Sequence, residues 1–136
     1  MSDGLGFGAN ARAALITRGI AEMQQLYEVF GAQSETLLSL AGLGDLILTC
    51  TDPQSRNRRF GFLVGEGLSV PEAKALIKQT IEGIHAAHEV HHLANKYQLF
   101  MPICEQVYHL VTNQITPRQA AQKLLERALK EEFPTQ

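Results

Sequence analysis

Apolar residues recur every three or four positions along most of the chain, which is the period of one face of an α-helix. The first stripe predicts a helix that Asn10 caps and that Gly31 ends in a left-handed turn. It consists of Ile16, Ile20, Met23, Tyr27 and Phe30.

Local start and stop signals mark the later helices. Ser69-Val70-Pro71-Glu72 and Thr116-Pro117-Arg118-Gln119 each combine a capping box with a proline near the first helical position, and Pro102 can open another helix. A short helix over residues 35–40 and an apolar turn capped by Asp45 are also predicted, and Gly65-Glu66-Gly67 ends a further segment. The inward-facing stripes of the later helices are Phe60, Leu63 and Val64; Ala86, Ala87, Val90, Leu93, Ala94 and Tyr97; Ile103, Val107, Leu110 and Val111; and Ala120, Ala121, Leu124, Leu125, Ala128 and Leu129.

The same pattern predicts the fold class. No useful run of alternating apolar and polar residues occurs, and no Asn-Gly or Asp-Gly turn joins two such runs. The helices differ in length and their stripes form no sustained heptad, so we expect an all-α, irregular multi-helix domain rather than a coiled coil. With 136 residues and 45% apolar content, the chain can bury one core, which predicts a single domain over residues 1–136.

Composition excludes several function classes. A net charge of -2 and an aromatic content of 7% argue against a nucleic-acid-binding surface. The sequence has no run of eighteen apolar residues and no signal peptide, so no membrane insertion is expected. Cys50 and Cys104 form no CxxC motif and are expected to be small core residues, which fits a reducing cytoplasm.

Two polar segments could carry chemistry. Arg56, Arg58 and Arg59 place three guanidinium groups within four positions, next to Ser55 and Asn57. Guanidinium groups offer paired donors to phosphate oxygens, so this segment can form a phosphate cradle, although a solvated basic patch explains the spacing as well. Asp45 follows Gly42-Leu43-Gly44 and precedes apolar residues, which suits either a partly buried functional carboxylate or an ordinary helix cap.

A third motif matches that of zinc hydrolases. His88-Glu89-Val90-His91-His92 has the H-E-x-x-H spacing of metalloproteases. Helical periodicity, however, places His88 and His92 opposite the apolar stripe of their helix, and no third ligand is evident. The pattern favours surface histidines over a metal site, and no metal is expected.

Four motifs in order resemble a known family. The first is Gly4-Leu5-Gly6-Phe7-Gly8-Ala9-Asn10-Ala11-Arg12-Ala13-Ala14-Leu15-Ile16-Thr17-Arg18-Gly19, which is similar to the start of the C-terminal domain of bacterial NAD(P)-dependent glycerol-3-phosphate dehydrogenases. The other three are Ala41-Gly42-Leu43-Gly44-Asp45-Leu46 with Thr49-Cys50-Thr51, then Ser55-Arg56-Asn57-Arg58-Arg59-Phe60-Gly61, and Glu82-Gly83.

The resemblance implies an oxidoreductase half. This family interconverts dihydroxyacetone phosphate and sn-glycerol 3-phosphate with NAD(P)H, and the product feeds phospholipid synthesis. Its helical domain is like that of 6-phosphogluconate dehydrogenases, and the active site lies between this domain and an N-terminal Rossmann domain. By motif position, Asp45 and Thr49 would be catalytic, Asp45 would also bind substrate with Ser55, Arg56 and Asn57, and the cofactor would contact Arg56, Thr80 and Glu82.

The sequence departs from the family in one large respect. It contains no strand, glycine loop and helix of a Rossmann domain, and the family's catalytic lysine lies upstream of Asp3. Met1 resembles an introduced start codon, so we expect a fragment that is inactive alone and whose partner is the missing Rossmann domain, with a homodimer also compatible. A non-catalytic helical interaction module is the remaining alternative.

Overall fold

The computed structural model of the chain describes residues 1–31 and 50–132. Every regular element in these two ranges is a helix, which confirms the all-α prediction. The predicted helix over 35–40 and the turn capped by Asp45 lie outside the described residues. The helices are α1 (Ala9–Val29), α4 (Arg56–Glu66), α5 (Val70–Ile77), α6 (Glu82–Tyr97), α7 (Pro102–Val111) and α8 (Pro117–Glu132).

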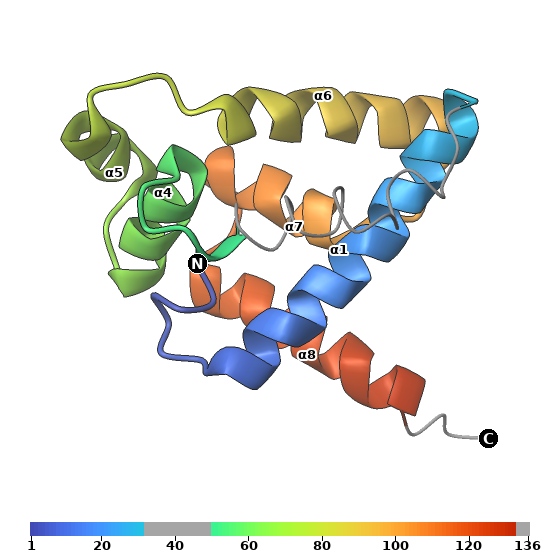
Figure 1. Cartoon of the computed structure of the whole chain (residues 1–136), viewed down its shortest axis with the longest axis horizontal. Helices are drawn as coiled ribbons and strands as arrows, with labels where there is room; N and C mark the ends of the chain where they lie inside the picture. Colours follow the sequence, from blue (N-terminus) through green and yellow to red (C-terminus); the bar gives the residue numbers. More distant parts are fainter. Residues whose placement is uncertain (32–49, 133–136) are drawn as a thin grey trace.

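The helices form an irregular bundle (Figure 1). α7 packs against α6 on one side and against α8 on the other, and α1 runs diagonally past α7. α4 and α5 pack together at one end of the molecule, where α4 also contacts α6 and α8. None of the described helices is long and apolar enough to cross a membrane.

The main core lies between α4, α5 and the beginning of α6. Met1 packs against it from the N-terminal segment, which runs so close to α4 that the backbone of Met1 faces Gly61 and Gly65. The inward positions predicted for α4 are confirmed, because Phe60 and Val64 are buried and Leu63 packs on them. The buried residues of this core are Phe60, Val64, Ala73, Ile77 and Ile81.

The predicted local signals begin and end several helices. The Ser69 hydroxyl accepts from the Glu72 N–H at 3.2 Å while the Glu72 carboxylate accepts from the Ser69 N–H at 3.2 Å, so the capping box is complete. Thr116 and Gln119 make the same reciprocal pair at the start of α8. Gly67 and Gly31 end α4 and α1 with positive φ values of 119° and 70°.

Some sequence expectations were wrong. Asn10 does not cap α1, because the extended backbone of Gly8 starts the helix two residues earlier and leaves Asn10 inside its first turn. Phe30 is 62% exposed because it follows the last helical residue of α1. Tyr97 and Leu125 are exposed too, as is Ala86, which lies one residue, or about 100° of helix, from the buried Ala87.

Candidate functional site

The N-termini of α4 and α6 meet at one corner of the molecule. Ser55 has the extended backbone of an N-cap, and its Oγ accepts a hydrogen bond from the Arg58 N–H at 3.3 Å. This capping bond fixes the first turn of α4, which carries Arg56 and Asn57. The sequence-predicted phosphate-binding residues therefore occupy a helix start, where N–H groups and the positive end of the helix dipole favour anions.

Asn57 connects this helix start to α6. Its Oδ1 accepts a hydrogen bond from the backbone N–H of Gly83 at 2.8 Å. α6 begins after Ile81, an apolar residue that provides no side-chain cap. The bond from Asn57 therefore satisfies one of the free N–H groups of the first turn of α6.

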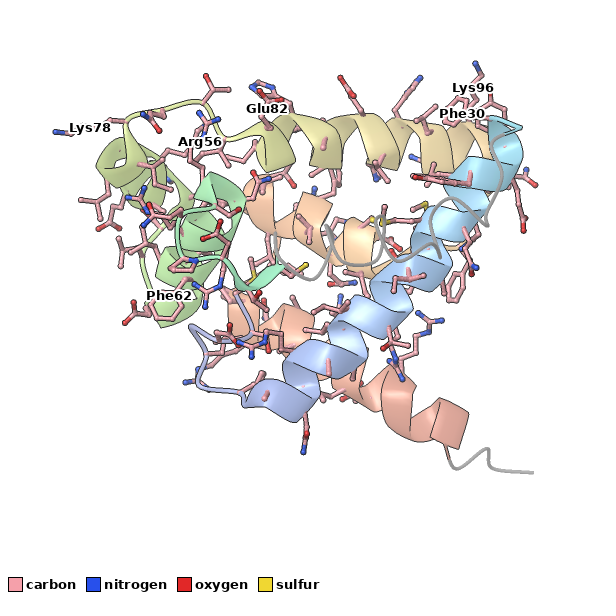
Figure 2. The ribbon with its side chains drawn as sticks, viewed as in Figure 1. Phe30, Arg56, Phe62, Lys78, Glu82 and Lys96 are labelled. Atoms are coloured by element: carbon pink, nitrogen blue, oxygen red, sulfur yellow. The ribbon has the colours of Figure 1, made fainter. Side chains whose placement is uncertain are left out.

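The predicted cofactor-contacting residues lie at the same corner. Thr80 belongs to the short connection between α5 and α6, and Glu82 is the first residue of α6. Figure 2 shows Arg56 and Glu82 beside this connection, on the side of the molecule where Lys78 also projects. Arg56, Asn57, Thr80 and Glu82 are all exposed, so an incoming ligand can reach them.

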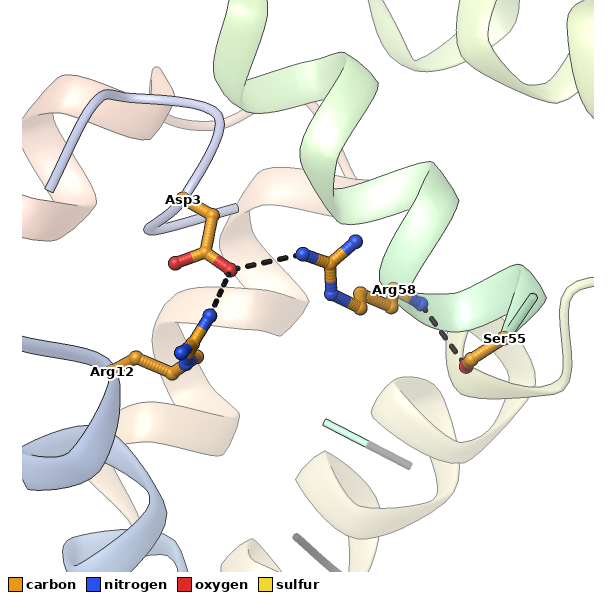
Figure 3. A network of polar contacts seen from close by, with 4 residues as sticks. All are labelled: Asp3, Arg12, Ser55 and Arg58. Carbon is orange, nitrogen blue, oxygen red and sulfur yellow. Dashed lines mark hydrogen bonds and ion pairs between the residues drawn. The ribbon is translucent and has the colours of Figure 1, made fainter. Parts of the chain in front are cut away.

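The three arginines do not form one cradle. The Arg58 guanidinium donates to Asp3 Oδ2 at 3.2 Å, and Arg12 donates to the same oxygen at 3.2 Å, as Figure 3 shows. Two residues along a helix correspond to about 200°, so Arg58 turns inward when Arg56 faces solvent. Arg58 thus ties the N-terminal segment to α4, whereas Arg56 and Arg59 are both exposed.

Both predicted catalytic residues, Asp45 and Thr49, lie outside the described residues, and their roles are predictions from the resemblance.

Two histidines of the segment 88–92, His88 and His91, contact a tyrosine of α7. The His91 ring stacks on Tyr108 with centroids 3.6 Å apart, and His88 meets the same ring edge-on at 5.4 Å. His88 and His92 are exposed, as the helical period predicts. Within residues 1–31 and 50–132, no three His, Cys, Asp or Glu side chains are grouped so that they could hold a metal ion.

Glu22 and Gln25 form a second cap between helices, which the sequence did not predict. Glu22 of α1 is 5% exposed, and its two carboxylate oxygens accept the N–H groups of Ile103 at 2.6 Å and Cys104 at 3.1 Å. Gln25, one turn later, accepts the Phe100 N–H at 3.0 Å and donates to the Phe100 carbonyl at 2.6 Å. No local signal could reveal these bonds, because their partners lie about eighty residues away in the sequence.

Fold and site together define an all-α domain whose polar corner offers an arginine and two helix starts. A family model described as "NAD-dependent glycerol-3-phosphate dehydrogenase C-terminus" matches residues 1–122. The chain therefore belongs to this family of C-terminal domains.

Individual relatives agree with the family match. The glycerol-3-phosphate dehydrogenase [NAD(P)+] of Halorhodospira halophila is 54% identical over 132 residues, which are 97% of this chain and 40% of the relative. The protein of the same name from Coxiella burnetii (strain RSA 493 / Nine Mile phase I) is 55% identical over the same shares. A crystal structure of glycerol-3-phosphate dehydrogenase from Coxiella burnetii superposes with a TM-score of 0.88 at 56% identity, covering 92% of this chain and 38% of that one. The chain thus spans about 40% of the length of these relatives.

Proposed function

We propose that this chain is the substrate-binding half of an enzyme that interconverts dihydroxyacetone phosphate and sn-glycerol 3-phosphate with NAD(P)H. Its product would supply glycerol 3-phosphate for phospholipid synthesis. One observation carries the proposal: in a chain of this family, Ser55, Arg56 and Asn57 share a corner with Thr80 and Glu82, joined by the bond from Gly83 to Asn57.

The corner has the donors that a phosphate group needs. Arg56 is exposed and supplies a permanent charge with paired N–H donors. The Ser55 Oγ accepts from Arg58, which leaves its hydroxyl hydrogen available to donate to a ligand. The Asn57 amide uses its oxygen on Gly83 and keeps its NH2 group for the same ligand.

The remaining roles rest on the family resemblance. Asp45 would hold and charge the lysine ammonium that protonates the ketone oxygen as it becomes an alkoxide, and Thr49 would lie near the reacting carbon. NAD(P)H supplies the hydride when bound, and Arg56, Thr80 and Glu82 would contact it. This lysine and most of the nucleotide site would belong to an N-terminal Rossmann domain.

Replacing one domain of a relative tests the proposal. In a chimaeric protein, this chain substitutes for the matching C-terminal part of the Coxiella burnetii relative. The rate of dihydroxyacetone phosphate reduction is measured as the oxidation of NADPH. We expect turnover from the chimaera and none from the 136-residue chain alone, which lacks the lysine. A folded but inactive chimaera, judged by circular dichroism and a cooperative thermal transition, would contradict the proposal.

Two arginine variants sharpen this test. Arg56→Ala should lower kcat/KM by roughly 10- to 150-fold, since a hydrogen bond to a charged group contributes about 1.5–3 kcal/mol. Arg118→Ala, in the first turn of α8 and also exposed, should stay within about twofold of the parent, as surface substitutions usually do. Equal losses in both variants would indicate a general charge effect rather than a phosphate contact.

A further inference from the structure

We propose that Asn57 is a positioning residue that couples the phosphate-binding end of the corner to its cofactor-contacting end. The inference rests on the proposed function and adds to it a physical link between two groups of ligand-binding residues. The link is the hydrogen bond from the Gly83 N–H to Asn57 Oδ1, which spans 26 positions of sequence and joins α4 to α6.

This bond takes the place of a helix cap. Helices need acceptors for the N–H groups of their first turn, and a local Ser, Thr, Asp or Asn usually supplies one. α6 has Ile81 at its N-cap position, and Ile81 is 5% exposed because it packs into the core with Ile77. The chain thus uses the cap position for core packing, and α6 obtains its cap from Asn57.

Gly83 makes this approach possible. A Cβ atom at Gly83 would lie 2.9 Å from Asn57 Oδ1 and 3.1 Å from Asn57 Cγ, which is too close for a carbon. Any larger residue at this position would therefore push the Asn57 side chain away from the start of α6. Displacement of Asn57 would also break its hydrogen bond to the Gly83 N–H. The start of α6, which includes Glu82, would then lose its attachment to α4.

The bond also fixes which way the Asn57 amide faces. If the amide turned by half a rotation, its NH2 group would meet the Gly83 N–H, and two donors would oppose each other without an acceptor. The Asn57 NH2 group is therefore held in one orientation, ready to donate to an anion. The Asn57 side chain therefore holds the start of α6 with its oxygen and presents its NH2 group to phosphate.

Ligands at the two ends of the corner should bind cooperatively. A phosphate that orders the Asn57 amide also orders the start of α6, where Thr80 and Glu82 lie. By thermodynamic reciprocity, a cofactor that orders this start must favour phosphate binding to the same degree. Glycerol 3-phosphate should therefore tighten NADPH binding, and the coupling should depend on Asn57 and Gly83.

Three variants of the chimaeric protein separate the two roles of Asn57. Asn57→Asp keeps an oxygen for the Gly83 N–H but loses the NH2 donors and adds a charge that repels phosphate, whereas Asn57→Ala loses both roles. Gly83→Ala removes no side chain, and its added methyl group displaces the Asn57 side chain from the start of α6. Gly19→Ala is the matched control, because it adds the same methyl group inside α1, where a Cβ meets nothing within 4 Å.

The readouts are the KM for dihydroxyacetone phosphate and the NADPH dissociation constant, with and without glycerol 3-phosphate. For Asn57→Asp we expect the KM to rise about tenfold or more, as for a lost charge-assisted contact, with NADPH affinity in the absence of glycerol 3-phosphate within about twofold of the parent. Gly83→Ala should raise both constants at least about threefold and abolish the coupling, which lies typically between 5- and 150-fold when present. Gly83→Ala with unchanged constants and coupling, or Asn57→Asp with NADPH affinity as weak as Asn57→Ala, would overturn the proposal.

A measurement on the 136-residue chain is independent of activity. Amide hydrogen exchange at Gly83, followed by NMR, should be slow in the parent and in Asn57→Asp and at least about tenfold faster in Asn57→Ala, because a bonded N–H exchanges only when its bond opens. Rapid exchange in the parent would refute the link even if the chimaera is active. An inactive chimaera with protected Gly83 would instead refute the proposed function and leave the link in place.

Discussion

Cys104 is a thiol whose burial, together with the nearby Glu22 carboxylate, raises its pKa. Burial of the thiol, the negative charge of Glu22 and a hydrogen bond to Glu22 raise the pKa of Cys104 from 9.0 to about 12. Burial also raises the pKa of Cys50. Both cysteines are half-buried, so the expectation of core cysteines holds only in part.

The raised pKa predicts low reactivity for Cys104. Only the thiolate attacks alkylating reagents, and a shift of about three pKa units removes most of it, so Cys104 should react roughly 30-fold more slowly than a free thiol after its greater intrinsic nucleophilicity is included. Mass spectrometry after timed iodoacetamide labelling at pH 8 measures this rate. Glu22→Gln should speed the reaction, because it removes the charge that opposes the thiolate. Labelling of Cys104 in the parent protein at the rate of a free thiol would show that the pKa of Cys104 is not raised.

The same shift makes stability depend on pH. The folded pKa of Cys104 lies above its unfolded value, so the folded state retains a proton that the unfolded state releases as pH rises from about 9 toward 12. The contribution of the protonated Cys104 thiol to stability is complete below pH 9 and is lost as the pH rises from about 9 toward 12. Tyrosine and lysine side chains titrate there too, so Cys104→Ala is compared with the parent. The stability difference between the two proteins should be constant below pH 9 and change with pH only above it.

At the scale of the helices, caps fall into two kinds. α4, α5 and α8 take their caps from Ser55, Ser69 and Thr116, each next to the helix it starts. α6 and α7 begin after apolar residues and take theirs from Asn57 and Glu22, on other helices. Apolar N-cap residues pack into the core, and the distant side chains then tie one helix to another.

This division also explains what the sequence could predict. Both capping boxes, the opening proline of α7 and the glycine end of α4 depend on neighbours within four residues, and all were predicted. The caps from Asn57 and Glu22 join residues that are distant in the sequence, so neighbouring residues could not predict them. At the candidate site, the resemblance gave the residues, but only the structure showed that Asn57 binds Gly83 and that Arg58 binds Asp3.

The cap from Glu22 should contribute measurably to stability. Glu22→Gln retains one acceptor, so one of the N–H groups of Ile103 and Cys104 loses its partner and faces an NH2 group. The expected loss is about 1–3 kcal/mol in the free energy of unfolding, the range for a buried polar group left without a partner. Urea denaturation of the 136-residue chain measures it. Glu28→Gln, on the exposed side of α1, is the control and should change stability by less than about 0.5 kcal/mol.

At the scale of the whole molecule, the described chain leaves a large apolar surface open. A groove of about 230 Å³ lies between the N-terminal segment, α1, α7 and α8. Its walls are mostly aliphatic and include Leu5, Ala11, Leu15, Val107 and Ala121. Apolar surface left open to water in such a groove contributes nothing to stability, whereas the same surface would stabilise the fold if it were buried.

Filling the groove should therefore stabilise the isolated chain. Ala11 is half-buried in its wall, so Ala11→Leu places new apolar carbons inside without displacing a polar group. At about 0.8 kcal/mol for each buried CH2, partial burial predicts a gain of about 1–2 kcal/mol and a rise in Tm of roughly 5 °C. Ala13→Leu, on the exposed side of the same helix, should change the Tm little. The fluorescence of bound anilinonaphthalene sulfonate should fall in Ala11→Leu and remain in Ala13→Leu. A loss of stability in Ala11→Leu alone would mean that the groove is already filled when the chain folds in solution.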